Sequence, residues 1–96
     1  MSLDVRWTDE AEFTFDHIVS FILEHWGERS SEKFIAKTRN TLLNISRQPF
    51  LFPESDIENV RKALITRQSS VFYEIHSDYI MLVFFWDNRQ DPIFIP

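Results

Sequence analysis

The sequence predicts a small α+β domain in which a helical hairpin packs on one face of a mainly antiparallel sheet, in the order β-α-α-β-β-β. Two apolar stripes of helical period occupy the first half of the chain, and a lone glycine lies between them. Three runs rich in β-branched and aromatic residues follow, separated by short polar breaks. Helices segregated from a run of strands in this way are typical of two-layer α+β domains.

Composition narrows the classes of function. The chain has 96 residues, so we expect residues 1–96 to form one domain with a single modest core. It has no cysteine and one glycine, which excludes thiolate chemistry and glycine-rich phosphate loops. The net charge of −5 argues against direct, sequence-specific binding of nucleic acid, because Lys and Arg supply most of such affinity. No membrane-spanning run or signal peptide is visible, so we expect a cytoplasmic protein.

The first strand and the first helix are predicted within residues 3–26. Alternation of apolar and polar residues from Leu3 to Trp7 predicts a short strand. Thr8 or Asp9 can cap the helix that follows, and Gly27 fits the left-handed position just after its end. The apolar stripe of this helix consists of Ala11, Phe15, Ile18, Val19, Ile22 and Trp26.

A second helix is predicted to begin at Ser30 or Ser31 and to end before Pro49, since the residue preceding a proline avoids helical geometry. The short connection makes the two helices an antiparallel hairpin. The segment from Pro49 to Pro53 cannot be regular. We expect Phe50 and Phe52 within it to cover the core first and to contact a partner second.

Residues 60–92 are predicted to form a meander of three strands, with breaks at Gln68-Ser69 and Ser77-Asp78. The last strand, Tyr79–Trp86, has no charged residue, which predicts apolar surroundings on both faces. Strict alternation divides it into two sets: Tyr79, Met81, Val83 and Phe85 on one face, and Ile80, Leu82, Phe84 and Trp86 on the other.

Two helices can cover one face of this meander and leave the other uncovered. We therefore expect an apolar groove on the uncovered face, bordered by the Phe50–Phe52 loop and the Ile93–Ile95 tail. The residues expected to bind a partner there are Met81, Val83, Phe85, Phe50, Phe52 and Arg89. The occupant would be a partner protein, or a second copy of the chain in its absence.

The chain resembles the RelE/ParE superfamily of bacterial toxins over nearly its whole length. The resemblance lies in Trp7-Thr8, Trp26-Gly27, Lys33-Phe34, the Pro49–Pro53 break, Phe72-Tyr73-Glu74-Ile75 and Asn88-Arg89-Gln90-Asp91-Pro92. It implies the toxin half of a type II toxin–antitoxin module, in which a cognate antitoxin wraps the toxin. It implies no cofactor.

The superfamily contains metal-free messenger-RNA nucleases of the RelE type and the ParE branch, which poisons DNA gyrase without cutting RNA. The nuclease pattern has a basic pair on the second strand, where this chain has Arg61 and Ala63. Ser70 stands in place of a third-strand arginine, and no tyrosine or histidine follows Arg89. Cleavage needs a proton acceptor and donor as well as charge stabilisation. The resemblance is therefore closer to the ParE branch, with Arg61 and Arg89 as weak catalytic candidates.

Ordinary structural roles compete with these assignments. Arg89 can pair with a neighbouring aspartate, and Arg61 can pair with Glu58. His17 and His25 are two helical turns apart, too far to share a metal ion, so we expect no metal site. The remaining alternatives for function are a ribosome-dependent nuclease and a non-toxic binding domain that kept the fold.

Overall fold

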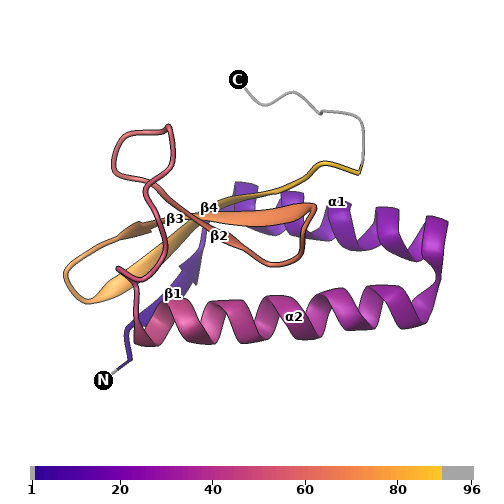
Figure 1. Ribbon diagram of the computed structural model, residues 1–96, viewed down its shortest axis with the longest axis horizontal. Coiled ribbons are helices and arrows are strands. Elements are labelled where there is room, and N and C mark those ends of the chain that lie inside the picture. Colours follow the sequence, from indigo (N-terminus) through magenta and orange to yellow (C-terminus); the bar gives the residue numbers. More distant parts are fainter. Residues whose placement is uncertain (1, 90–96) are drawn as a thin grey trace.

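The computed structural model describes residues 2–89. In chain order, its elements are β1 (Asp4–Trp7), α1 (Asp9–Trp26), α2 (Glu28–Arg47), β2 (Arg61–Leu64), β3 (Ser69–Ile75) and β4 (Tyr79–Asp87). The two helices run antiparallel, with the sheet beside them (Figure 1). The predicted α+β class and order of elements are confirmed. The expected contact of the Ile93–Ile95 tail falls outside the described residues.

The four strands form one mixed sheet in the order β1-β4-β3-β2. β2, β3 and β4 pair antiparallel, as the predicted meander requires. β1 pairs parallel with β4, from Asp4 opposite Tyr79 to Trp7 opposite Leu82. β4, which contains the charge-free run Tyr79–Trp86, therefore lies inside the sheet, between β1 and β3.

Thr8 fixes the start of α1. Its backbone is extended, and its Oγ1 accepts a hydrogen bond from the backbone N–H of Ala11 at 3.0 Å. Three acidic residues in the first turn interact favourably with the positive end of the helix dipole. The helix ends at Gly27, whose φ of 91° and ψ of 176° lie in a region that residues with a side chain rarely adopt.

α2 follows without a further connecting residue and runs from Glu28 to Arg47. The predicted start at Ser30 or Ser31 is wrong, because Gly27 alone reverses the direction of the chain. The predicted end before Pro49 is correct.

One hydrophobic core fills the space between the helices and the sheet. Burial of each of its large side chains contributes roughly 1.5–3 kcal/mol to stability. Trp26, predicted to belong to the buried stripe, is instead 53% exposed, because it lies at the end of α1 beside Phe21 and Arg89. The fully buried apolar side chains of the core are Ile18, Ile22, Ile45, Val71, Tyr73, Ile80, Leu82 and Phe85.

Candidate partner-binding face

The face of the sheet that points away from the helices carries many aromatic side chains. The rings of Phe72 and Phe84 stack with their centroids 4.5 Å apart. Lys62 Nζ lies 5.7 Å from the centre of the Phe72 ring, and the Arg6 guanidinium lies 4.0 Å from that of Tyr79. We call this surface the outer face; the strand pairing assigns to it Asp4, Arg6, Lys62, Leu64, Ser70, Phe72, Glu74, Tyr79, Met81, Phe84 and Trp86.

A β-bulge at Val83 decides which residues of β4 reach the outer face. Leu82 and Phe84 pair with neighbouring residues of β3, which leaves Val83 between them without a partner on that strand. An extra residue of this kind reverses the alternation of side chains along a strand. Leu82 faces the core before the bulge, and Phe85 faces it afterwards.

The predicted faces of β4 are therefore wrong beyond Val83. Phe85, expected in the open groove, is 1% exposed and stacks on Trp7 with the ring centroids 5.3 Å apart. Phe84 and Trp86, expected on the opposite face, belong to the outer face. Phe85 is thus a core residue and is unavailable to a partner.

Two threonines hold the bulge in place. Thr8 Oγ1 lies 2.9 Å from each of the carbonyl oxygens of Leu82 and Val83. Thr14 Oγ1 accepts a hydrogen bond from the backbone N–H of Phe85 at 2.8 Å. These contacts give partners to backbone groups of β4 at and beyond Leu82, the last residue of β4 that pairs with β1. The side chains that bind the backbone beside the bulge thus lie at the start of α1, far from β4 in the sequence.

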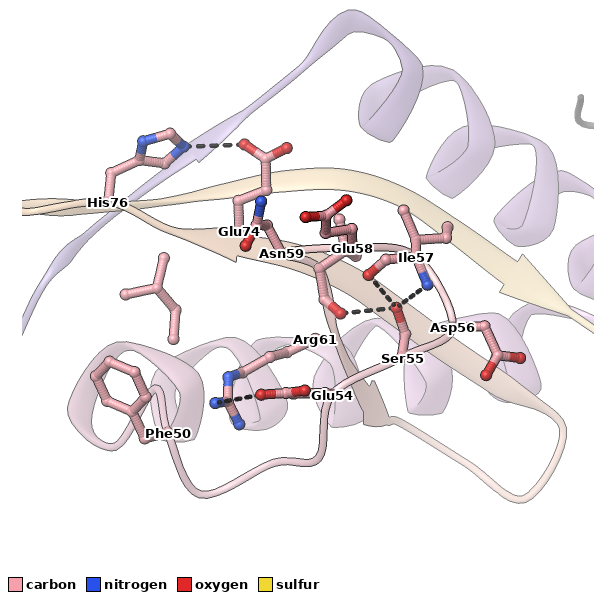
Figure 2. Close-up of a pocket in the computed structure, with 12 residues that line it drawn as sticks. Phe50, Glu54, Ser55, Asp56, Ile57, Glu58, Asn59, Arg61, Glu74 and His76 are labelled. Carbon is pink, nitrogen blue, oxygen red and sulfur yellow. Dashed lines mark hydrogen bonds and ion pairs between the residues drawn. The ribbon is translucent and has the colours of Figure 1, made fainter.

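The segment between α2 and β2 forms the wall of a hollow of about 670 Å³, shown in Figure 2. Arg61 ties this segment to the sheet. Its Nη1 donates a hydrogen bond to the carbonyl oxygen of Phe52 at 2.6 Å, and its Nη2 lies 3.7 Å from Glu54 Oε2. The guanidinium also lies 5.2 Å from the centre of the Phe50 ring. The expected ion pair is therefore made with Glu54, and Glu58 is not its partner.

Tyr73 provides a second tie to the same segment. Its hydroxyl donates a hydrogen bond to the carbonyl oxygen of Pro49 at 2.7 Å. Burial raises the pKa of Tyr73 to about 12, and the positive charge of Arg61 opposes this rise. The hydroxyl therefore keeps its proton, and with it the hydrogen bond, at any physiological pH.

The hollow is predominantly acidic. Four carboxylates line it, and Arg61 is the one Lys or Arg among its lining residues, already engaged as described. His76 Nε2 lies 2.9 Å from Glu74 Oε1, so this histidine also has a local partner. The lining carboxylates are Glu54, Asp56, Glu58 and Glu74. Such surroundings repel a phosphodiester rather than bind it.

A second hollow, of about 560 Å³, lies between the same segment and the outer face. Ile57 and Lys62 line it, together with the aromatic residues Phe72, Phe84 and Trp86. This hollow extends the outer face toward the segment that carries Phe50. It is the part of the described surface that best matches the predicted apolar groove.

The other residues predicted to contact a partner differ in their exposure. Phe50 is 69% exposed at the edge of the first hollow, while Phe52 is partly buried and packs against the core. Met81 and Val83 are half-buried. The prediction that this loop covers the core first therefore holds for Phe52 and fails for Phe50.

Arg89 is bound by the aspartate that precedes it by two residues. Its Nε lies 3.0 Å from Asp87 Oδ1, and its Nη2 lies 2.7 Å from Asp87 Oδ2. The hydrogen bonds that Arg89 donates to the Asp87 carboxylate raise the pKa of Arg89. The Asp87 side chain is fully buried, so this pair is an integral part of the fold.

Arg89 also borders a small cleft of about 220 Å³ near the end of the helical hairpin that Gly27 closes, beside the β2–β3 turn. Its guanidinium lies 5.5 Å from the centre of the Trp26 ring, and Lys33 and Lys37 of α2 line the same cleft. No sequence pattern had grouped Arg89 with Lys33 and Lys37. Lys33 and Lys37 are four residues apart and so share one face of α2. Arg89 and the β2–β3 turn, which complete the cleft, are distant from them in the sequence.

The two catalytic candidates do not meet. Arg61 lies opposite Tyr73 on β3, whereas Asn88, the neighbour of Arg89, donates a backbone hydrogen bond to Gln68 beside the other end of β3. Tyr73 and Gln68 are five residues apart, so the two positions are separated by roughly 17 Å at about 3.4 Å per residue. Each arginine is engaged by its own local partners, so Arg61 and Arg89 do not form a shared basic centre.

Within residues 2–89, no group of three or more His, Asp or Glu side chains is arranged to hold a metal ion. Neither helix within residues 2–89 combines the length and the hydrophobicity that a membrane-spanning segment needs.

Comparison with solved structures shows the same fold in bacterial toxin–antitoxin proteins. A chain of the chromosomal ParDE system from P. aeruginosa superposes with a TM-score of 0.78 at 15% identity, covering 90% of this chain and 96% of that one. The RelBE2 toxin–antitoxin complex from Mycobacterium tuberculosis gives 0.65 at 15% identity, covering 91% and 99%. The YoeB dimer from Staphylococcus aureus gives 0.60 at 13% identity, covering 88% and 94%. The curated protein sequences contain no match.

The sequence itself assigns the family. Residues 5–92 match the ParE toxin of the type II toxin–antitoxin system parDE. The match spans every helix and strand of the structure apart from the first residue of β1. It also agrees with the resemblance to the ParE branch found in the sequence. The chain belongs to the ParE toxin family.

Proposed function

We propose that this toxin acts by binding its target and not by cutting RNA, and that a cognate antitoxin neutralises it by covering the outer face. The observation that carries the proposal is the outer face itself, with the stacked pair Phe72 and Phe84 beside Trp86. A contiguous apolar surface of this kind is typical of an interaction site. Lys62 and Arg6 border it and add specificity through charge.

The arrangement of Arg61 and Arg89 supports the view that the toxin is not a nuclease. Arg61 binds Phe52 and Glu54, Arg89 binds Asp87, and the two lie at opposite ends of β3. The carboxylates beside them, Glu54 and Asp87, are engaged by the arginines themselves, and the acidic hollow around Arg61 disfavours the approach of RNA phosphates. We expect no cleavage of messenger RNA in a primer-extension assay with purified toxin and translating ribosomes. Reproducible cleavage at defined codons would reject this part of the proposal and favour the RelE-type alternative.

The antitoxin contact can be tested by a matched pair of substitutions. Phe84→Ala removes one ring of the outer face, whereas Phe13→Ala removes a ring that is 63% exposed on α1. We expect Phe84→Ala to weaken binding of the antitoxin encoded beside the toxin by at least about tenfold, as for a hot-spot residue, and Phe13→Ala to change it less than about twofold. Equal effects of the two substitutions on binding, with circular dichroism showing both variants to be folded, would mean that the antitoxin does not bind the outer face.

DNA gyrase is the proposed target, on the strength of the likeness to the ParE branch. The assay is supercoiling by purified gyrase with increasing toxin, with cleaved DNA as a second readout. We expect inhibition that the antitoxin reverses. Full supercoiling at a large molar excess of folded toxin would leave the toxin with another target or make it a non-toxic binding domain. In the absence of antitoxin, a second copy of the chain is the alternative occupant of the outer face.

A further inference from the structure

The helical hairpin separates positive from negative charge between its two helices. α1 carries five acidic residues and no Lys or Arg. α2 carries five Lys and Arg residues and two acidic ones. The two helices lie side by side, so one half of the surface that faces away from the sheet is acidic and the other half is basic.

The outward residues follow from helical geometry. Asp9, Phe13 and Glu24 lie roughly 120–180° around α1 from its buried residues Ile18 and Ile22. All three are exposed, and Phe13 is 63% exposed. α1 therefore presents an aromatic side chain between two carboxylates.

α2 presents the matching pattern. Arg29, Leu43 and Arg47 lie roughly 140–180° around the helix from the buried residues Thr38 and Phe34. All three are exposed, and Leu43 is 45% exposed. The apolar residue again lies between two charges, here of the opposite sign.

The two patterns have the same spacing along the hairpin. Gly27 alone joins the two antiparallel helices, so two residues that are equally far from Gly27 in the sequence lie at the same height along the helix axes. We call this height the level of a residue. By this rule Glu24 lies level with Ser30, next to Arg29. Likewise Phe13 lies level with Thr41, about half a turn from Leu43, and Asp9 lies level with Ile45, about half a turn from Arg47.

We propose that two copies of this chain associate through their helical hairpins about a two-fold axis parallel to the helices. That rotation lays α1 of one copy antiparallel on α2 of the other and preserves the level of every residue. Phe13 then meets Leu43 of the other copy, and each carboxylate meets an arginine: Glu24 with Arg29, and Asp9 with Arg47. Because the interface is isologous, each contact forms twice.

The available area is sufficient for a weak dimer. Helices of 18 and 20 residues are about 27 and 30 Å long and about 10 Å wide. Together they offer roughly 500 Å² per copy, so the total is about 1,000 Å², at the lower limit for a specific interface. The pairing should therefore be concentration-dependent and sensitive to salt. It uses the surface opposite the outer face, so it leaves both antitoxin sites accessible, and it does not depend on the proposed function.

The experiment is sedimentation velocity of the full chain over a range of concentrations reaching several hundred micromolar, on the order expected for a weak interface, at low and high salt. We expect a monomer–dimer equilibrium that weakens at high salt. Phe13→Ser should raise the dimer Kd at least about tenfold, as for a hot-spot residue. Its control is Phe50→Ser, since Phe50 is 69% exposed and lies outside the two helices; this should change Kd less than about twofold.

A charge exchange tests the pairing directly. Glu24→Lys and Arg29→Glu each place a like charge opposite its partner, and both suit the dipole at their own helix end. Each single variant should abolish the dimer, and the double variant should restore Kd to within about threefold. Glu58→Lys makes the same charge change outside the hairpin and should leave the dimer intact. A monomer at every concentration, equal effects of Phe13→Ser and Phe50→Ser, or no restoration in the double variant would overturn the proposal.

Discussion

Loss of the Arg89 guanidinium should destabilise the whole domain. Its two side-chain hydrogen bonds to Asp87 are 3.0 and 2.7 Å long, and the Asp87 side chain is fully buried. Arg89→Ala would leave a buried carboxylate without its counter-charge. Hydrogen bonds to charged groups contribute about 1.5–3 kcal/mol, and breaking a buried pair costs about 3–5 kcal/mol. Because a quarter of the Arg89 side chain is exposed, water can partly replace it, and we expect a loss of about 2–3 kcal/mol.

The assay is urea unfolding followed by circular dichroism, with thermal melting as a second measure. A loss of this size lowers Tm by roughly 10–20 °C in a domain of about 100 residues. Asp87→Asn in the Arg89→Ala background removes the unpaired charge, so the double variant should recover about 1 kcal/mol or more. Arg67→Ala, at an exposed position in the nearby turn, is the control and should change stability by less than about 0.5 kcal/mol.

A free energy of unfolding for Arg89→Ala within about 0.5 kcal/mol of the unmodified chain would refute this reasoning. It would mean that water compensates the buried carboxylate fully. The result also affects the proposed function. If Arg89→Ala abolishes toxicity and destabilises the fold to the same extent, the arginine has a structural role. If toxicity falls while the fold stays intact, Arg89 contacts the target.

Three further predictions concern stability. The pKa of Tyr73 is about 12 in the folded protein against an ordinary value of 10.0, so the stability contributed by its protonated hydroxyl is complete below pH 10 and is lost as the pH rises from 10 to 12. The free energy of unfolding should decline by about 2–3 kcal/mol over this range, and Tyr73→Phe should remove the decline. An unchanged decline in that variant would assign the pH dependence to other groups. Gly27→Ala meets no atom within 4 Å but must adopt a φ of 91°, so it should cost about 1–3 kcal/mol by thermal unfolding, and a neutral result would mean that the connection can adopt another conformation. Thr14→Val deprives the Phe85 N–H of its acceptor and should cost about 1–3 kcal/mol in urea unfolding, whereas Thr14→Ser keeps the hydroxyl and should cost less; equal losses would mean that this hydrogen bond contributes nothing to stability.

The fold was predictable because local signals agreed with the final arrangement. Thr8 caps α1 as expected, Gly27 has the expected positive φ, and the last three strands form the expected meander. The parallel pairing of β1 with β4 was not predicted. It joins the two ends of the chain, and no sequence pattern specifies which edge of a meander a distant strand will take.

The candidate site was less predictable, for a specific physical reason. An alternation rule assigns faces correctly until a residue is inserted, and the bulge at Val83 inserts one inside a run that has no polar residue to reveal the shift. The contacts beside the bulge come from elsewhere in the chain: Thr8, the N-cap of α1, and Thr14 of α1 bind backbone groups of Leu82, Val83 and Phe85. Thr8 could be recognised as a cap from its position, but its second role depends on the packing of α1 against β4.

The two arginines show how an ordinary structural role can be hidden in a functional pattern. Asp87 precedes Arg89 by two residues, and this spacing made an ion pair plausible from the sequence. That the carboxylate is fully buried could not be foreseen, because it depends on the same bulge that turns Phe85 and Asp87 toward the core. Without the bulge, strict alternation would place both Phe85 and Asp87 on the outer face. Because of the extra residue at Val83, Phe85 and Asp87 face the interior instead of the outer face. Arg89 therefore binds a buried carboxylate.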